Sequence, residues 1–527
     1  MPHSLFTLPD PRDLVPISFP YDRLSRWPDP AADNLFAFDA TDRLLVDMAA
    51  SAIREVASGS VVVIGDRYGA LTLAVASLGC PGTRGIRCHQ DAYGARMALQ
   101  ANFESLADSL GLVMPPDGMG ASTDTLEQGW NSASKVSDGQ TITPKDGVLV
   151  ADTQELDVFQ SCELDESLLA GAEVILMQLP KDLSQLDHWA SLIAAYASPN
   201  VKVFAGGRIK HMTRAMNEVL ERHFGQVSAS LARQKSRVLL AGEPRRSAVP
   251  GIETRDELKR GGLKQTPGQL PKQSPEQSSN QSRSDLPEGD HNESSSRNQS
   301  PKHLLDSDPN EYFDSELKLW VCSYPGAFAA GRVDIGTRFL IPFIEQMPRH
   351  TMGGTAADLG CGTGLLTAAL LRSHPEYHVI ATDRSAVAVR SAKATLRRNG
   401  CEPLLDGLVE DGDQGEAILR RNGFEPADNR AGAARYEVRQ DHALFQQPDA
   451  SLDLIVCNPP FHSEASVSTA LSEFLFREAA RTLRPGGIML TVFNSHLEHR
   501  RALQRLVGPT EQLGRNQKFT VTRTVRI

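Results

Sequence analysis

The sequence lacks any apolar run near the roughly 18 residues that a helix needs to cross a bilayer. Its N-terminal stretch, MPHSLFTLPDPRD, has no basic segment followed by an apolar one, so it does not resemble a secretory signal. The seven cysteines form no CxxC pair, which argues against a zinc site and against a disulfide framework. These absences favour a protein of the reducing cytoplasm, with no membrane segment and no metal.

Positive charge is also scarce overall. The net charge of −10 argues against binding nucleic acid over the whole surface. Two segments have the opposite sign: residues 202–237 hold eight Lys/Arg against two Glu, and residues 496–527 hold seven against two. Either segment can be a phosphate-binding face, or simply a solvated face of a helix or strand.

The length of 527 residues is too great for one ordinary domain. Residues 243–309 are rich in Ser, Gln, Pro, Asn and charge, and poor in aliphatic side chains. Such a segment buries too little surface to offset its ordering entropy, which predicts a disordered linker. We therefore expect an N-terminal domain over 1–242 and a C-terminal domain over 310–527. A low-complexity stretch at 114–148 reads as a loop insertion in the first.

Both halves alternate apolar strand-like runs with helical patterns, which predicts an α/β fold with doubly wound, mostly parallel sheets. The C-terminal half shows this most clearly. Its expected strands are 355–359, 378–382, 435–439, 453–457 and 487–493, and its expected helices are 364–373, 385–399, 468–483 and 497–507. A short repeat, ATLRRNGCEP at 394–403 and AILRRNGFEP at 417–426, reads as a local duplication without a function of its own.

The two halves resemble each other in rhythm but differ in their chemical residues. The stretch GCGTG at 360–364 corresponds to GDRYG at 65–69, and NPPF at 458–461 corresponds to QLPK at 178–181. Both members of each pair follow an apolar run, so the underlying folds are expected to be related. The pattern predicts two related domains, of which only the second keeps a site.

The glycine turn DLGCGTG is the first candidate site. Gly360, Gly362 and Gly364 allow a tight strand–helix turn and a close backbone approach to a ligand. Asp358 precedes the turn and suits a cationic or amine-bearing ligand. Asp383, about 20 residues on at the end of the next strand, can hold ribose hydroxyls.

S-adenosylmethionine meets these requirements. Its amino acid moiety would lie by Asp358 and the glycines, with Cys361 in the same turn, and its ribose on Asp383. Asp441, after a third strand, could accept from the adenine amine. A simple tight connection also explains the glycine turn, and Asp is common at strand ends in any case.

The second candidate site is Asn458-Pro459-Pro460-Phe461, directly after an apolar strand. An exocyclic amine on a base is a poor nucleophile, because its lone pair is delocalised. The Asn458 oxygen and the rigid Pro459 carbonyl can each accept one N–H, which localises that lone pair and aims it. Phe461 can stack on a planar substrate. His462 can contact the substrate, act as a proton acceptor or be a partly buried structural histidine. A plain strand-ending turn is the alternative for the whole stretch.

DLGCGTG together with NPPFH resembles the ribosomal RNA guanine-N2 methyltransferases, whose two tandem class I methyltransferase domains are Rossmann-like and whose first domain is degenerate. Three further stretches look like the enzymes that act on large-subunit rRNA: LPKDLSQLDHWASL at 179–192, AGGRIKHMTRAMNEVLERHFG at 205–225 and NSHLEHRRALQRLVG at 494–508. The likeness covers both halves, but not the predicted linker or the loop insertions.

The resemblance implies roles for matching positions. The cofactor-binding residues would be Asp358, Gly360, Cys361, Gly362, Gly364, Asp383 and Asp441, and the catalytic residues Asn458, Pro459, Pro460 and Phe461. Phe328 and Asp334 would border the site. The first domain would help to bind RNA and support the second. Because two domains in one chain could replace a dimer, we expect a monomer, with the oligomeric state left open by the sequence.

The function expected from these observations is S-adenosylmethionine-dependent methylation of the exocyclic N2 of a guanine in rRNA, of the large-subunit (23S) type. A small-subunit (16S) guanine, an adenine N6 and a protein glutamine amide stay open, because the same residues serve each. A non-catalytic RNA-binding or ribosome assembly factor is the alternative from another class. The intact glycine turn, Asp383 and the NPPF stretch argue against it.

Overall fold

The computed structural model describes residues 9–31, 35–112, 158–246, 308–328, 332–349, 353–401, 436–460 and 465–527, with only the backbone of 465–469. Most of the predicted linker, the predicted loop insertion at 114–148 and the second copy of the repeat lie outside these residues. The two seven-stranded sheets described below belong to one compact unit of the chain.

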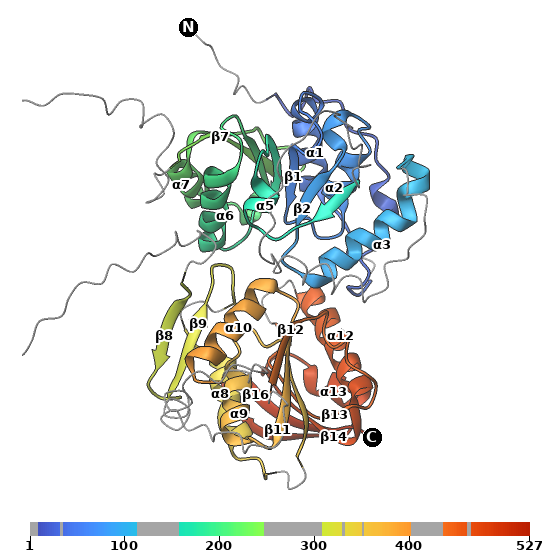
Figure 1. The fold of residues 1–527 in the computed structure, drawn as a ribbon. Coiled ribbons are helices and arrows are strands. Elements are labelled where there is room, and N and C mark those ends of the chain that lie inside the picture. The colour runs from blue at the N-terminus through green and yellow to red at the C-terminus, as the bar shows by residue number, and fades with distance from the viewer. Residues whose placement is uncertain are drawn as a thin grey trace, which may run out of the picture. The chain divides into compact units, whose positions relative to one another are not determined.

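The first sheet is formed by the N-terminal half, with the order β3-β2-β1-β4-β5-β7-β6 (Figure 1). The first five strands in this order run parallel, and β7 pairs antiparallel with both β5 and β6. The strands are β1 (Val61–Ile64), β2 (Ile86–His89), β3 (Phe159–Ser161), β4 (Val174–Gln178), β5 (Lys202–Arg208), β6 (Phe224–Ala229) and β7 (Ser236–Pro244).

Helices cover both faces of this sheet, which is why a strand such as β1 is apolar and buried along its whole length. One face carries α1 (Ala40–Arg54), α2 (Ala70–Ala76) and α3 (Tyr93–Leu110), and the other carries α5 (Glu166–Leu169), α6 (Leu183–Tyr196) and α7 (Arg214–His223). A capping box begins α1: Asp39 accepts from the helix, and the Asp42 carboxylate accepts from the Asp39 N–H at 2.7 Å.

The second sheet repeats the same order in the C-terminal half, as β12-β11-β10-β13-β14-β16-β15. Its strands are β10 (Gly354–Leu359), β11 (Tyr377–Asp383), β12 (Tyr436–Gln440), β13 (Leu452–Cys457), β14 (Leu483–Asn494), β15 (Thr510–Arg515) and β16 (Phe519–Val525). Again the first five in the order are parallel, and β16 pairs antiparallel with β14 and β15. The doubly wound α/β fold predicted from the sequence is confirmed.

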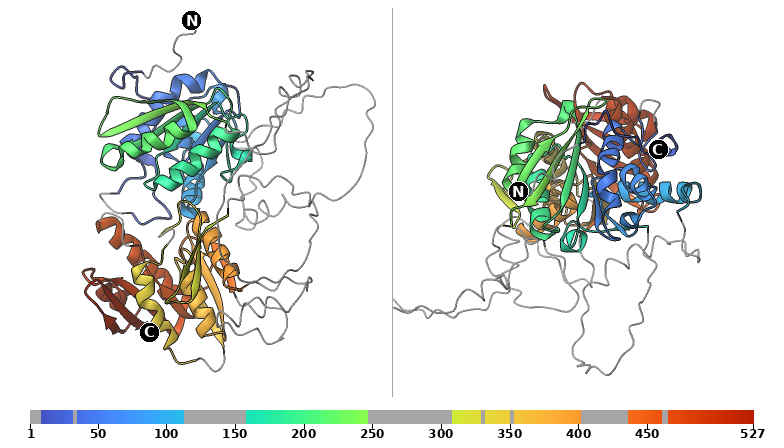
Figure 2. Two further views of the ribbon diagram at one scale, coloured as in Figure 1. Left: turned by 90° about the vertical axis from the view of Figure 1, so that its left-hand side faces the viewer. Right: turned by 90° about the horizontal axis from the view of Figure 1, so that it is seen from above.

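Two helical layers cover this sheet as well (Figure 2). The helices α8 (Ile335–Glu345), α9 (Leu365–Ser373) and α10 (Ala386–Arg398) share one apolar core, while α12 (Ala465–Thr482) and α13 (His499–Leu506) share the other. A two-stranded sheet of β8 (Asn310–Asp314) and β9 (Leu319–Ser323) precedes α8, and Asn399 after α10 holds β9 by hydrogen bonds to Trp320.

Five elements of this half were not predicted from the sequence. The strands β15 and β16 lack a clear apolar pattern, because threonine takes the place of aliphatic residues at buried positions: Thr522 and Thr524 are fully buried. Helix α8 contains Pro342, which normally indicates the end of a helix. The pair β8–β9 has several exposed residues on β8. Among the described helices, none has the length and apolar character to span a membrane.

Candidate active site

The site lies where β10 and β13 end side by side in the second sheet. Leu359 of β10 is paired with Cys457 of β13, so Gly360 and Asn458 leave the sheet as neighbours. The chain order reverses between these strands, since β11 and β12 lie on one side of β10 and β14 lies beyond β13. In open α/β sheets, ligands bind at such a point, outside the carboxyl ends of the strands.

The glycine turn needs its glycines for two different reasons. Gly360, Gly362 and Gly364 have φ angles of 77°, 54° and 78°, in the left-handed region. A Cβ on Gly364 would also lie 3.0 Å from the Cα of Ala392 in α10, so this position packs one helix against another. Among the described residues beyond the chain neighbours of each glycine, no heavy atom lies within 4 Å of a Cβ built on Gly360 or Gly362. The first part of the turn therefore borders open space, as a ligand-facing backbone must.

Asp358 is the buried anchor of this turn. One of its oxygens, Oδ2, accepts from the backbone N–H of Thr367 at 2.9 Å and from the Thr367 hydroxyl at 2.7 Å. The other oxygen, Oδ1, is buried and has no hydrogen-bond partner among the described residues. Burial raises the pKa of Asp358 to about 7, with a contribution from the nearby Asp383.

Asp383 connects the turn to the end of β11. Its Oδ2 accepts from the Gly362 N–H at 2.9 Å, and its Oδ1 accepts from the Ser385 N–H at 2.9 Å. Each carboxylate oxygen has a second lone pair, so both can still accept from a hydroxyl. Burial raises the pKa of Asp383.

Asp441 follows β12 and is held beside Asp383, whose carbonyl accepts from the Asp441 N–H at 3.0 Å. Its Oδ2 accepts from the Gln446 N–H at 3.2 Å, while the buried Oδ1 has no partner in the described part of the chain. Burial raises the pKa of Asp441 to about 6. The three acidic residues predicted for one site are thus brought to one edge of the sheet.

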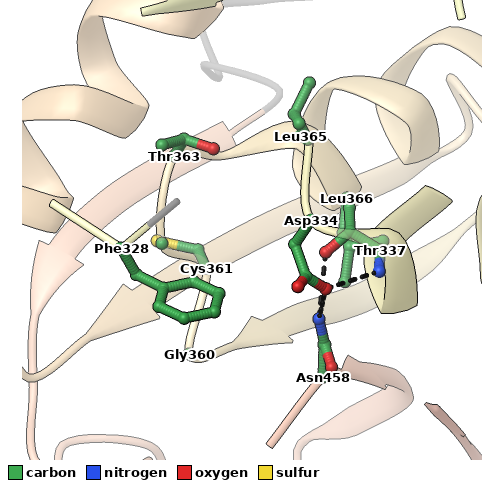
Figure 3. Close-up of a pocket in the computed structure, with 10 residues that line it drawn as sticks. Phe328, Asp334, Thr337, Gly360, Cys361, Thr363, Leu365, Leu366 and Asn458 are labelled. Atoms are coloured by element: carbon green, nitrogen blue, oxygen red, sulfur yellow. Dashed lines mark hydrogen bonds between the residues drawn. The ribbon is translucent and has the colours of Figure 1, made fainter. Parts of the chain in front are cut away.

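Asn458 begins the second candidate stretch and is held by α8 (Figure 3). Its Nδ2 donates to Asp334 Oδ2 at 2.8 Å and to the hydroxyl of Thr337 at 3.0 Å. Its Oδ1 is buried and has no partner within the described ranges. Pro459 is buried and Pro460 is exposed. Phe461 and His462 lie outside the described residues.

A pocket connects the two candidate stretches. Its lining comes from the glycine turn, the start of α9, the start of α8 and the end of β13, and consists of Phe328, Asp334, Thr337, Gly360, Cys361, Gly362, Thr363, Leu365, Leu366 and Asn458. Phe328 and Asp334, expected to border the site, do so. The predicted site residues Asp358, Gly364, Asp383, Asp441 and Pro459 are not part of this lining, and Asp383 is joined to it by its hydrogen bond from Gly362.

The sequence reasoning missed Thr337. The spacing D-x-x-T after a loop was a usable signal, because Asp is a strong N-cap and the third residue on faces it. Cys361, placed with the cofactor residues from the sequence, lines the pocket. Burial raises the pKa of the Cys361 thiol well above its usual range, so it is a neutral, apolar wall and not a nucleophile.

The residues present fit S-adenosylmethionine. Two buried carboxylate oxygens, Asp358 Oδ1 and Asp441 Oδ1, are acceptors without a partner in the described structure. Buried acceptors are normally satisfied, so these two suit the donors of a ligand. The open space at Gly360 and Gly362 gives that ligand room against the backbone. Three carboxylates lie at this edge, with Arg439 Nε 4.0 Å from Asp441 Oδ2, and a ligand that carries positive charge suits the acidic residues.

The equivalent turn in the first sheet is filled. Asp66, in the place of Cys361, accepts from the Gly69 N–H at 3.0 Å and from the Thr72 N–H at 2.8 Å, so the protein's own carboxylate caps α2. A Cβ on Gly65 would lie 3.4 Å from the Gln178 side chain and 3.7 Å from Trp189. The first half was expected to be degenerate, and the structure agrees: at Gly65, the counterpart of Gly360, neighbouring side chains occupy the space that is open beside Gly360.

Two family models match the chain. The model for the RLMG N-terminal domain matches residues 16–111 and 151–245, and the model for the Methyltransferase small domain matches residues 318–418 and 425–523. Among solved structures, the chain is similar to the T. thermophilus 16S rRNA N2 methyltransferase RsmC in complex with AdoMet and guanosine. That match has a TM-score of 0.54 at 14% identity and covers 96% of this chain and 99% of that one.

Curated relatives match along nearly the whole length. The ribosomal RNA large subunit methyltransferase G of Streptomyces avermitilis is 28% identical over 512 residues, which are 95% of this chain and 96% of the relative. The protein of the same name from Pseudomonas entomophila is 25% identical over 499 residues, which are 94% and 96% of the two chains. With a matching family model in each half and these full-length relatives, the chain belongs to the ribosomal RNA guanine-N2 methyltransferase family with tandem methyltransferase-like domains, of the large-subunit type.

Proposed function

We propose that this protein transfers the methyl group of S-adenosylmethionine to the exocyclic N2 of a guanine in large-subunit rRNA. The single observation that carries the proposal is the Asn458 amide. Its Oδ1 is a buried acceptor without a described partner, and it stands one strand away from the glycine turn. A base amine entering the pocket would satisfy that acceptor.

The cofactor supplies an activated methyl group when it is bound. Asp358 and Asp441 would hold its polar groups with their unpartnered oxygens, and Asp383 would accept from its ribose. Gly360 and Gly362 leave room for it against the backbone. Cys361, Leu365 and Leu366 provide an apolar wall that helps to exclude water from the reacting atoms.

The chain's own contribution to the reaction is to orient the amine. Asn458 Oδ1 would accept one N–H of the guanine amine, and the carbonyl of Pro459 would accept the other. Two fixed acceptors hold the nitrogen lone pair in one direction and lose little entropy, since Pro459 has a restricted backbone. The proton leaves after the transfer, so the site needs no strong base.

The preference for large-subunit rRNA rests on the two full-length relatives that carry that name. The two basic segments, each either a phosphate-binding or a merely solvated face, lie on described elements, 202–237 from β5 to β7 and 496–527 from α13 to β16. They fit a polyanionic substrate in an otherwise acidic chain.

The test is a methyl-transfer assay with labelled cofactor and unmodified 23S and 16S rRNA, followed by nucleoside analysis of the product. We expect N2-methylguanosine in 23S rRNA, and a loss of at least 100-fold with Asn458→Ala, the scale of removing one catalytic hydrogen-bond acceptor. Equal labelling of both rRNAs would contradict the substrate assignment. Unchanged labelling by the variant would contradict the role of Asn458.

The finer partner assignments are part of the same proposal: a cytoplasmic monomer that acts without a metal, on rRNA that is free or within a ribosomal subunit. Light scattering of the purified chain tests the monomer, and assays with naked 23S rRNA, assembled subunits and added chelator test the remaining points.

A further inference from the structure

We propose that Asp334 and Thr337 are positioning residues that fix which end of the Asn458 amide faces the substrate. The inference rests on the proposed function and names residues that act through Asn458. An asparagine amide has an acceptor end and a donor end of nearly the same shape. Only the acceptor end can bind an amine proton, so a catalytic amide that could turn over would present the wrong group part of the time.

The contacts around Asn458 allow one orientation. Nδ2 has two protons, and two acceptors meet them, Asp334 Oδ2 at 2.8 Å and Thr337 Oγ1 at 3.0 Å. The reverse orientation would place Oδ1 of Asn458 against the Asp334 carboxylate, with no proton between the two oxygens. With both protons of Nδ2 used, Oδ1 is the end left without a partner among the described residues, and it would accept from a base amine.

Helix α8 holds the two acceptors in place. Asp334 is its N-cap, and the same Oδ2 accepts from the Thr337 N–H at 3.0 Å. Gly336, one of the two residues between them, has no side chain, and a Cβ there would lie 3.0 Å from Asp334 Oδ2 and 3.2 Å from Asn458 Oδ1. The close approach of α8 to β13 therefore depends on a glycine at this position, and the three side chains form one unit (Figure 3).

A negatively charged acceptor adds a second effect. A carboxylate that accepts from Nδ2 draws the amide toward its charge-separated form, which leaves more negative charge on Oδ1 and makes it a stronger acceptor. The capping role alone explains the Thr337 N–H contact but not the bond to Nδ2. The capping role and the positioning role of Asp334 can be separated by experiment, because a serine can cap a helix without reaching Asn458.

The experiment compares full-length Asp334→Ser, Asp334→Asn, Asn458→Ala and the double variant Asp334→Ser/Asn458→Ala. Serine keeps the N-cap and loses the contact to Asn458, whereas asparagine keeps an oxygen at that distance. A matched cap control is Asp182→Ser, because Asp182 is the N-cap of α6 in the other half and accepts from the Gln185 N–H at 2.9 Å. The readouts are kcat, KM for rRNA and the affinity for S-adenosylmethionine by calorimetry.

For Asp334→Ser we expect kcat to fall on the order of 100-fold, the usual cost of misplacing a reacting group. The cofactor affinity should stay within about twofold, and Asp334→Asn should retain a kcat at least about fivefold above that of Asp334→Ser. In the Asn458→Ala background, Asp334→Ser should cost nothing further, since Asp334 acts through Asn458. Asp182→Ser should leave kcat unchanged.

Three results would overturn the inference: a kcat for Asp334→Ser equal to wild type, a loss that adds fully to that of Asn458→Ala, or a loss that appears in cofactor affinity instead of kcat. Each of these can occur while Asn458→Ala is inactive, and then only the positioning role fails. If Asn458→Ala retains wild-type activity, the proposed function of the site fails first.

Discussion

Thr367 donates both its backbone N–H and its hydroxyl to a single oxygen of Asp358, at 2.9 and 2.7 Å. The effect is to lock the carboxylate against the first turn of α9 and to leave Oδ1 as a buried acceptor without a described partner. A buried carboxylate in this state resists ionisation, which is why the pKa of Asp358 is raised to about 7. A ligand with positive charge would reverse that effect.

Cofactor affinity should therefore depend on pH. Ionised Asp358 and Asp441, whose pKa values burial raises to about 7 and about 6, attract a cationic ligand, and their protonated forms do not. We expect the affinity for S-adenosylmethionine to rise from pH 5.5 to 8 and then level off, measured by calorimetry. Asp358→Asn should bind more weakly at pH 8 and lose most of the slope above pH 6. An unchanged slope in that variant would contradict the assignment.

The same carboxyl should affect the stability of the cofactor-free protein in the opposite direction. Because its folded-state pKa is raised above the ordinary value of 3.8, its contribution to folding is fully present below about pH 4 and is lost as the pH rises through about 7. Asp358→Asn removes this titration. We expect the free energy of unfolding of the variant, relative to wild type, to increase between pH 4 and pH 8 in urea titrations. A constant difference would show that Asp358 is ionised throughout.

Gly360 and Gly364 should respond differently to alanine, although both have left-handed backbones. That conformation costs each variant about 1 to 2 kcal/mol. At Gly364, the new Cβ also meets Ala392 at 3.0 Å, which adds about 1 to 3 kcal/mol of overpacking. At Gly360 the Cβ meets no atom of the described, non-adjacent residues within 4 Å, so its further effect should be on ligand binding.

Urea unfolding and calorimetry separate the two variants. We expect Gly364→Ala to be the less stable, and Gly360→Ala to keep most of its stability but to bind S-adenosylmethionine at least tenfold more weakly, the scale of a small steric misfit. Equal stabilities would contradict the packing role of Gly364. Normal cofactor binding by Gly360→Ala would contradict the placement of the ligand beside this turn.

The sequence was sufficient for the repeated strand–helix pattern and for the residues at the strand ends. DLGCGTG and NPPF each follow an apolar strand, and in a parallel sheet those ends meet at one edge, so the proximity of Gly360 and Asn458 followed from pattern and topology. The role of α8 did not follow. Pro342 lies within that helix, and the contact of Asp334 with Asn458 joins residues 124 positions apart, a distance over which no local pattern carries information.

The first half should bind no cofactor. Its turn is capped by Asp66, and its Gly65 faces Gln178 and Trp189 instead of open space. We expect calorimetry to give one S-adenosylmethionine per chain, and Gly360→Ala to weaken all of the binding observed. A stoichiometry of two, or a residual tight site in that variant, would show that the filled turn opens.

The turn between β15 and β16 should contact the rRNA backbone. Arg515 and Lys518 are exposed there, and the turn is fixed because Asn516 Oδ1 accepts from the N–H of Lys518 at 2.8 Å. The next residue, Phe519, lies beside the site: a Cβ on Gly336 would be 3.2 Å from its ring and 3.2 Å from Asn458 Oδ1. Cations at this rim would meet the phosphates that flank a base entering the pocket.

Arg515→Ala/Lys518→Ala should raise KM for rRNA about three- to tenfold and should lower the slope of log affinity against log salt by about one to two. The matched control is Arg484→Ala. Arg484 pairs with Asp453 at 2.7 Å near the first residue of β14, whereas the β15–β16 turn lies beside the last residue of that strand, Asn494. Filter binding at several salt concentrations gives both quantities, and cofactor affinity should not change. The same salt slope in the double variant and in wild type would mean that the turn does not contact the rRNA backbone. An equal loss of rRNA affinity in Arg484→Ala would mean that any charge removed from this half has the same effect, so that the turn makes no specific contribution.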